Sequence, residues 1–242
     1  MLFLFTIWLF EAEISISVSE YEIKIDMSNL YFGIFSIVSG GYTLPMNFVV
    51  LSSSRGTTFQ FIINAIKDGS LEATCLGLVT DRSDRECIAK AQSAGIPVKI
   101  VEESEGESRE GYDQRLDAAI KELGDIDVIA AIGWMFILTP AFIQTWQNKI
   151  INVHPALLPK YGGEGMFGSR VHQAVLDSGD VTTGMTIHVM DEGVDTGRIL
   201  LQKECDVLPE DTVEMLKTRV QGLEKEWYPH LLQMLHTGEM KV

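Results

Sequence analysis

The sequence predicts an α/β protein with a doubly wound, mostly parallel sheet. From Asn47 onward, short apolar segments alternate with longer segments that carry helix caps and stops. Such alternation is typical of β-α-β units, whose strands run parallel. The length fits as well, because 242 residues are enough for one α/β domain plus an extension. A chain of this size can bury a core without disulfides.

The strands are expected at the short apolar segments, which are residues 47–52, 71–80, 98–101, 126–131, 150–153, 183–190 and 198–206. The helices are expected between them, at residues 57–67, 84–94, 108–123, from 140 onward, and 211–235. Thr57 or Thr58, Ser108 and Thr139 have side chains that can cap a helix, and Pro140 suits a first helical position. Gly69 is the expected stop of the first helix. Pro229 is expected to make the last helix irregular.

Residues 1–45 do not follow this pattern, and we expect them to be an extension of unknown role ahead of a domain at residues 46–242. The first ten residues are apolar but too few to span a bilayer. They also lack the basic region and the cleavage site of a signal peptide. Residues 14–26 alternate, which predicts a strand, and residues 30–38 are apolar again. The alternative is that residues 1–45 form a membrane anchor. A start codon at Met46 would explain why these residues do not follow the pattern of the domain.

The charge and the cysteines narrow the class of function. A net charge of -15 repels phosphate backbones, so a nucleic-acid partner is not expected. An anionic ligand would need a local site such as a helix N-terminus. The three cysteines, Cys75, Cys87 and Cys205, have no metal or redox spacing. They are expected to be core residues of a cytoplasmic protein, with a catalytic thiol as the alternative. The oligomeric state stays open, a homodimer included.

Ligands of doubly wound sheets bind beyond the C-terminal ends of the strands. This rule points to residues 52–58, 133–138 and 152–161. The first segment, SSSRGTT, joins a strand to a helix and is rich in small residues. Its backbone N–H groups can hold a phosphate, although an ordinary tight turn is the alternative. It is neither a GxGxxG nor a P-loop sequence, so dinucleotide and ATP binding lose support.

Two further segments can carry chemistry. Asn152 and His154 lie two residues apart at a strand end, so their side chains share one face. An Asn amide can donate to a developing oxyanion, and a His can move a proton at neutral pH. The loop MDEGVDTG at 190–197 carries three carboxylates, one of which could orient the His. The alternatives are a structural His and a surface turn; a calcium site is less expected because the spacing is not that of an EF-hand.

The strings NVHPALLPKY at 152–161 and DEGVDTG at 191–197 resemble the phosphoribosylglycinamide formyltransferases, which use 10-formyltetrahydrofolate. The resemblance runs from Met46 to about Leu235. It implies a formyltransferase of purine biosynthesis with a Rossmann-like fold and catalytic residues Asn152, His154 and Asp195. It also implies two sets of binding residues. The substrate is bound by Gly56, Thr57 and Thr58 at its phosphate and by Glu224 at its amine side. The folate is bound by Asn152, Arg109, Met135, Phe136, Ile137, Leu138, Asp191, Glu192, Gly193 and Val194.

The sequence departs from the common pattern of this family at several positions. Thr58 stands where an Asn is usual, and Ser54 replaces a Gly, which bears on the phosphate contacts. Phe136 stands where an Arg is common, which bears on the polar contacts to the folate. The segment Gly162 to Gly168 replaces a shorter loop and resembles a subgroup of the family. It could reshape the substrate cleft.

The expected mechanism is direct attack of the substrate amine on the formyl carbon. Asn152 and a protonated His154 would stabilise the tetrahedral oxyanion, an effect of about 3–4 kcal/mol per donor. Asp195 would orient His154 and help to move a proton. No metal is expected, because the donor is already activated, and no membrane partner is expected.

Four other proteins of this general type were considered. A methionyl-tRNA formyltransferase should carry a further domain and a basic surface, and a formyltetrahydrofolate deformylase a leading regulatory domain. A formyltransferase acting on a nucleotide-linked amino sugar stays open, as does a non-catalytic nucleotide-binding module.

Overall fold

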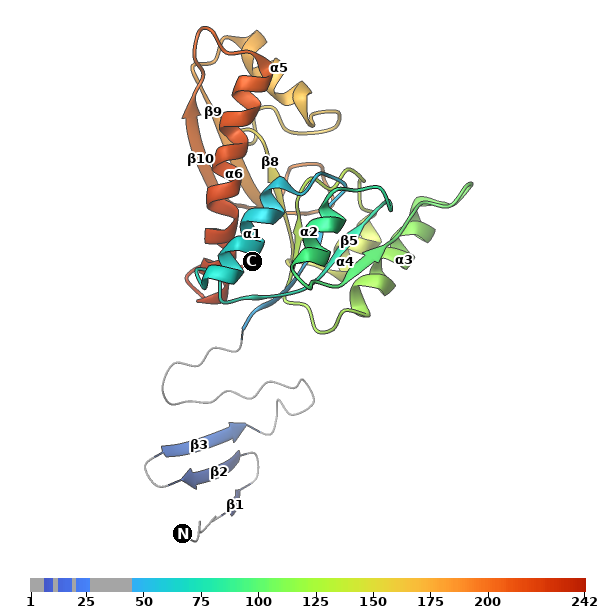
Figure 1. Ribbon diagram of the computed structural model, residues 1–242. Coiled ribbons are helices and arrows are strands. Elements are labelled where there is room, and N and C mark those ends of the chain that lie inside the picture. The colour runs from blue at the N-terminus through green and yellow to red at the C-terminus, as the bar shows by residue number, and fades with distance from the viewer. Residues whose placement is uncertain (1–6, 11–12, 19–20, 27–44) are drawn as a thin grey trace. The chain divides into compact units, whose positions relative to one another are not determined.

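The computed structural model describes residues 7–10, 13–18, 21–26 and 45–242. The chain divides into two compact units, Met1–Leu44 and Pro45–Val242. The described part of the first unit is an antiparallel sheet of β1 (Ile7–Phe10), β2 (Glu13–Val18) and β3 (Tyr21–Asp26) (Figure 1). The alternating segment 14–26, predicted as one strand, is therefore two paired strands, with Val18 opposite Tyr21. The predicted apolar segment 30–38 lies outside the described residues.

None of the helices in the described residues combines the length with the apolar character that a membrane span requires.

The second unit contains a seven-stranded sheet in the order β10-β9-β8-β7-β4-β5-β6. The strands from β8 to β6 are parallel, whereas β9 is antiparallel to both of its neighbours. The doubly wound, mostly parallel sheet predicted from the sequence is thus confirmed. Its strands are β4 (Asn47–Leu51), β5 (Thr74–Thr80), β6 (Val98–Ile100), β7 (Val128–Ala131), β8 (Ile150–His154), β9 (Thr182–Val189) and β10 (Ile199–Asp206).

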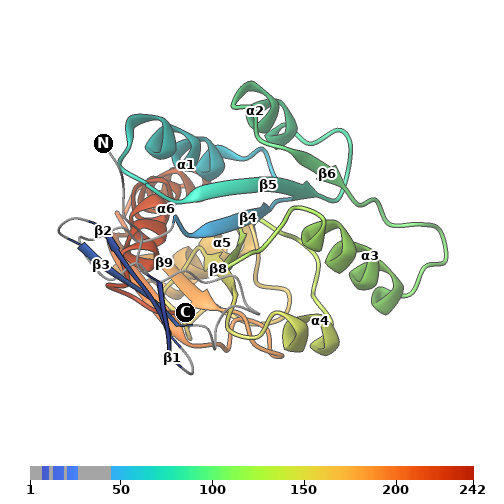
Figure 2. The same cartoon turned by 90° about the horizontal axis from the view of Figure 1, so that it is seen from below.

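Six helices cover this sheet on its two faces. They are α1 (Thr57–Asp68), α2 (Cys87–Ser93), α3 (Arg109–Lys121), α4 (Pro140–Thr145), α5 (Ser169–Ser178) and α6 (Val213–His236). Figure 2 shows α1 and α2 on one side of β4 and β5, and α3 and α4 on the other. The side chains of β4 alternate between the two cores, because successive residues of a strand point to opposite faces. Phe48 and Val50 pack with α1 and α6, whereas Val49 and Leu51 pack with α3 and α4.

The helix ends test the expected caps. Ser108 and Thr139 cap α3 and α4 through their hydroxyls, as predicted. The prediction of a Thr57 or Thr58 cap on α1 is wrong, because the cap position is Gly56 in a left-handed conformation and no side chain caps the helix. Gly69 ends α1 as expected. Pro229 lies inside α6, buried, and the helix continues through it.

Two elements begin three residues later than the pattern predicted. Strand β5 begins at Thr74 and not at Leu71, because the segment before it packs on α1, where the Leu71 N–H donates to the Ala65 carbonyl. Helix α2 begins at Cys87 and not at 84, because Asp84 is held in the preceding turn by Arg82. Neither difference changes the order of the sheet.

The strand order reverses at β4, which lies between β5 and β7. The chain leaves β4 toward β5 and β6 and then returns to place β7 on the other side of β4. The loops after β4 and β7 therefore diverge beyond the ends of their strands. Close to the strands they remain joined, because the Ser53 N–H donates to the Gly133 carbonyl. Ligand sites in doubly wound sheets lie in the crevice that such a reversal creates.

Candidate active site

A cavity of about 600 Å³ lies at this reversal, beyond the C-terminal ends of β4, β7 and β8. Its wall comes from segments far apart in the sequence: the loops after those three strands, the 190–195 loop, and one face of α6. All three residues expected to be catalytic, Asn152, His154 and Asp195, line it. The structure therefore brings these three side chains into one space, as the proposed chemistry requires.

His154 and Asp195 form a buried pair in the cavity wall. His154 Nδ1 lies 3.2 Å from Asp195 Oδ2, and both side chains are less than a tenth exposed. The other ring nitrogen of His154, Nε2, lies 2.8 Å from the Tyr161 carbonyl. Both partners are acceptors, so a protonated ring satisfies both contacts, whereas the neutral ring satisfies one.

The burial of His154 acts against that protonated form. Burial lowers the pKa of His154 below its usual range, although the Asp195 charge and the Tyr161 carbonyl oppose the shift. The neutral ring is therefore favoured at neutral pH in the free protein. This differs from the protonated ring expected from the sequence, and the reason is desolvation of the cation. A ring that is neutral at rest, with a partner for its second proton, can accept a proton during a reaction.

The backbone around Asp195 holds its carboxylate in place. Asp195 adopts a left-handed conformation with φ of 59°, and the Gly163 N–H donates to its Oδ2 at 3.1 Å. Burial raises the pKa of Asp195, but its contacts with His188, with His154 and with the Gly163 N–H outweigh burial, so the pKa lies below its ordinary value. Asp195 is therefore ionised at neutral pH and can stabilise a protonated His154.

A second histidine, His188, completes this cluster and was missed in the sequence. It lies on β9 directly opposite Asn152 on β8. Its Nε2 is 3.3 Å from the Asn152 amide nitrogen and 3.5 Å from Asp195 Oδ1, while its Nδ1 lies 3.0 Å from the Val189 carbonyl. If Nδ1–H donates to that carbonyl, Nε2 accepts from the amide of Asn152. The sequence signal for the contact between His188 and Asn152 was weak, because that contact depends on the register of β8 and β9.

The expected phosphate-binding segment lies at the other end of the cavity. Thr57 and Thr58 line the cavity together with Arg55, whereas Gly56 does not. Because no side chain caps α1, the N–H groups of its first turn are left for a ligand. The positive end of the helix dipole also favours an anion there.

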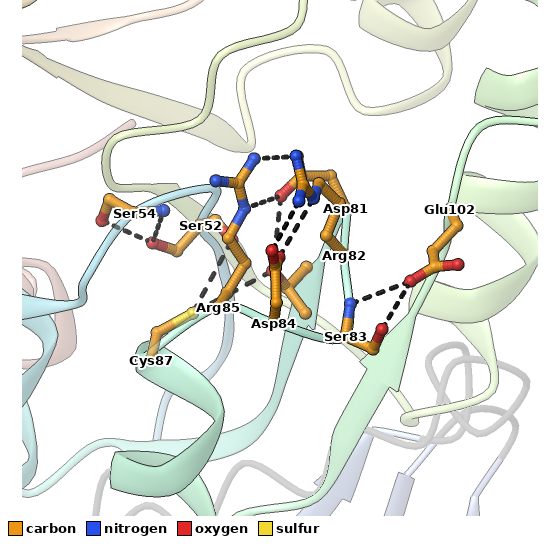
Figure 3. Close-up of polar contacts among 10 residues, drawn as sticks. Ser52, Ser54, Asp81, Arg82, Ser83, Asp84, Arg85, Cys87 and Glu102 are labelled. Carbon is orange, nitrogen blue, oxygen red and sulfur yellow. Dashed lines mark hydrogen bonds and ion pairs between the residues drawn. The ribbon is translucent and has the colours of Figure 1, made fainter.

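A polar network beneath that segment holds it in shape (Figure 3). The Ser54 hydroxyl accepts from the Gly56 N–H at 3.2 Å and lies 2.9 Å from the Ser52 hydroxyl. Asp81, only 3% exposed, accepts two hydrogen bonds from Arg85 at the start of α2. Gly56 sits against α2, and a Cβ on it would lie 2.7 Å from the Cβ of Cys87. This segment, residues 52–58, is therefore pre-formed, and we refer to it as the anion cradle.

Glu224 on α6 lies beside this cradle. Its Oε2 accepts from the Thr58 hydroxyl at 3.4 Å, which joins the expected phosphate side to the expected amine side. Burial raises the pKa of Glu224 to about 7, and the Thr58 hydroxyl opposes the shift only in part. The carboxyl is therefore balanced between its neutral and ionised forms near neutral pH.

The expected folate side of the cavity is largely apolar. Met135, Phe136, Ile137 and Leu138 line it after β7, and Asp191, Glu192, Gly193 and Val194 line it from the 190–195 loop. Met135 and Ile137 are more than half exposed, although both are large and apolar. Exposed apolar side chains around a concave site are typical of a ligand-binding wall.

Arg109, expected to face the folate, is not part of the cavity wall. Its guanidinium lies over the rings of Tyr112 and Phe136, at 4.3 and 4.6 Å from their centroids. It also pairs with the buried carboxylate of Asp113 at 3.2 Å. Arg109 thus supports Phe136 from behind, and Phe136 occupies the wall itself.

The three cysteines are not part of the cavity wall. Burial raises the pKa of Cys75 to about 12, so its reactive thiolate is scarce at neutral pH. Cys87 is part of the core, and Cys75 and Cys205 pack against it.

Within residues 45–242 and the described strands before them, no group of three or more His, Cys, Asp or Glu side chains could hold a metal ion.

The fold and the site together define an α/β protein whose cavity holds Asn152, His154 and Asp195 between an uncapped helix N-terminus and a largely apolar wall. Comparison with known proteins gives the family. The chain belongs to the formyl transferase family, whose model matches residues 46–232.

Several relatives share this region. The chain is 34% identical over 200 residues to the trifunctional purine biosynthetic protein adenosine-3 of Gallus gallus, covering 83% of this chain and 19% of that protein. It thus spans about a fifth of the length of such curated relatives. Two solved structures are similar over most of both chains. A phosphoribosylglycinamide formyltransferase from Coxiella burnetii is 34% identical, with a TM-score of 0.75 over 82% of this chain and 90% of that one. A glycinamide ribonucleotide transformylase from Symbiobacterium toebii is 28% identical, with a TM-score of 0.77 over 84% and 96%.

Proposed function

We propose that this protein transfers the formyl group of 10-formyltetrahydrofolate to the amine of glycinamide ribonucleotide, a step of purine biosynthesis. In this proposal residues 46–242 are the catalytic domain and residues 1–45 an extension. The observation that carries it is the position of Asn152, His154 and Asp195 in one cavity, between the α1 cradle and the apolar wall. The solved structures that resemble this chain are named for the same activity.

The two ends of the cavity suit the two substrates. The uncapped first turn of α1 and the Arg55 side chain suit a phosphate monoester. The largely apolar wall formed by residues 135–138 suits the face of a flat ring system such as a pterin. The three central side chains then lie where the amine of one substrate would meet the formyl group of the other.

The chemistry follows from what these side chains can donate and accept. When the amine attacks the formyl carbon, the formyl oxygen becomes an oxyanion. The Asn152 amide has a second N–H besides the one facing His188, and this N–H can donate to the oxyanion. His154 can take the proton released by the amine and return it to the departing folate nitrogen. Asp195 stabilises the imidazolium formed in between.

The same proposal includes a cytoplasmic location, where folates and nucleotide precursors are available, and small molecules as the only partners other than a second copy of the chain. The oligomeric state would be measured by sedimentation. The segment Gly163 to Gly168 lines the cavity, so this unusual loop would touch the acceptor.

The experiment mixes the purified chain with 10-formyltetrahydrofolate and one amine at a time, and follows the release of tetrahydrofolate. Glycinamide ribonucleotide should react, and glycinamide without its ribose phosphate should react far more slowly. His154→Ala and Asp195→Asn should each lose turnover with unchanged circular dichroism. A response only to a nucleotide-linked amino sugar would replace the acceptor in this proposal, and no response to any amine would leave a binding module.

A further inference from the structure

A histidine on α5 lines the same cavity but plays no part in the chemistry described so far. His172 is only 2% exposed, and its ring borders the cavity. Its Nδ1 is buried and has no hydrogen-bond partner among the described residues. A buried N–H without an acceptor costs more than a buried nitrogen without a proton, so the missing partner of Nδ1 decides where the ring proton lies.

The protonation of His172 is set by its surroundings. Burial, the charge of Lys217 and, to a smaller extent, His154 together lower the pKa of His172 to about 4, while Glu214 opposes them. The ring is therefore neutral at neutral pH and carries one proton. Placing that proton on Nε2 avoids a buried N–H without an acceptor. The ring then offers an Nε2–H donor.

Lys217 offers a second donor from the facing helix. Helix α6 packs against α5, and Lys217 lines the cavity one turn before Gln221 and two turns before Glu224. Its ammonium lies 3.3 Å from the Glu214 carboxylate, which is 73% exposed. A pair with so exposed a partner is weak, so the ammonium remains available to a ligand.

We propose that His172 and Lys217 form a subsite for the carbonyl oxygen of the acceptor substrate, next to its reacting amine. The Nε2–H of His172 and the Lys217 ammonium are two donors, which suit an oxygen atom, and the Lys217 charge disfavours a protonated amine there. The inference rests on the proposed function, in which the acceptor is an amino-acid amide. The carbonyl is bonded to the carbon that bears the amine, so a carbonyl held here keeps the amine close to His154 and in its reactive, neutral form.

The test compares two acceptors that differ at the amide group. One is the stable carbocyclic analogue of glycinamide ribonucleotide, and the other is the same molecule with a trans-alkene in place of the amide, which keeps the planar shape, lacks the oxygen and adds no basic nitrogen. Each is assayed with the wild type, His172→Phe and Lys217→Met. His172→Phe keeps the size of the ring, and Lys217→Met keeps the length of the side chain at a partly exposed site, so it can be read if His172→Phe fails to fold. Lys67→Met, on the exposed surface of α1, is the control for loss of one positive charge.

The expected result is a loss that depends on the carbonyl. Each variant should lower kcat/KM about tenfold or more for the carbonyl acceptor, which is the effect of one lost hydrogen bond to a partly buried site. The loss should appear in the acceptor KM, since the contact exists before the transition state, and the KM of the folate should not change. The alkene analogue should react equally well with all of these proteins.

Two outcomes would overturn the subsite. Equal losses with both acceptors would show a structural role for the two residues, and no loss with either would show that they do not touch the acceptor. A wild type that turns over neither acceptor would overturn the proposed function itself, and that result is read before any variant is compared.

Discussion

The Asn152 amide and the His188 imidazole face each other across strands β8 and β9, with Nδ2 3.3 Å from Nε2. Either atom of an Asn amide can point toward the cavity, but a nitrogen that faces an acceptor fixes the orientation. With its own proton on Nδ1, which faces the Val189 carbonyl, His188 accepts at Nε2 and thereby holds the amide nitrogen, and not the amide oxygen, on its side of Asn152. Oxyanion stabilisation depends on such pre-oriented donors.

Removing Asn152 and removing His188 should therefore affect one and the same step. Asn152→Ala should lower kcat about 10²- to 10³-fold, the usual effect of losing one oxyanion donor. His188→Phe should lower kcat by a smaller factor, because the amide remains but is no longer held. The double variant should resemble Asn152→Ala alone, since a positioning residue has no effect once its target is absent. Additive losses in the double variant would show that His188 acts independently of Asn152.

The pattern of strands and helices could be predicted because it rests on local chemistry. Ser108 and Thr139 cap helices through bonds to N–H groups three residues away, and Gly69 ends a helix by its own conformation. Asn152 and His154 could be placed on one face by their spacing alone. Asp195 came from the resemblance, and the structure places its carboxylate against His154.

The features that the sequence did not predict depend on contacts between distant segments. His188 meets Asn152 only because of the register of β8 and β9. His172 and Lys217 approach each other only because α5 packs on α6. Arg109 leaves the cavity wall because the rings of Tyr112 and Phe136 provide a stacking surface. No periodicity within one segment carries that information.

Asp195→Asn should change both turnover and the titration of His154. The carboxylate raises the pKa of His154 against the effect of burial, so an uncharged amide should let that pKa fall further below its usual range. With the imidazolium no longer stabilised, kcat should fall about 10²- to 10⁴-fold, as for lost acid–base catalysis. The titration can be followed by NMR of the imidazole nitrogens, with Asp177→Asn on α5 as the control. An unchanged pKa of His154 would argue against the pair.

Gly56→Ala should destabilise the protein more than Gly69→Ala. Both glycines have positive φ, 69° and 81°, so alanine is strained at either position. At Gly56 the new Cβ would also lie 2.7 Å from the Cβ of Cys87, whereas nothing lies within 4 Å at Gly69. We expect a loss of about 1 kcal/mol in the free energy of unfolding at Gly69 and about 2–3 kcal/mol at Gly56. Urea unfolding measures the loss in each variant. Equal losses would mean that α2 can move away from the new Cβ without a loss of stability.

Glu224→Gln should make stability less sensitive to pH. The pKa of Glu224 is raised from 4.5 to about 7 by burial. Between these values the folded protein holds a proton that the unfolded chain has lost, so the free energy of unfolding of the wild type falls as pH rises from about 4.5 to 7.

Glutamine carries no such proton. The variant should therefore gain stability relative to the wild type by up to about 3 kcal/mol at pH 8, and less where solvent reaches the carboxyl, with little difference at pH 4. Chemical denaturation at the two pH values measures this, with the exposed Glu226→Gln on the same helix as the control. A parallel pH dependence in wild type and variant would mean that the Glu224 carboxyl is well solvated in the folded protein.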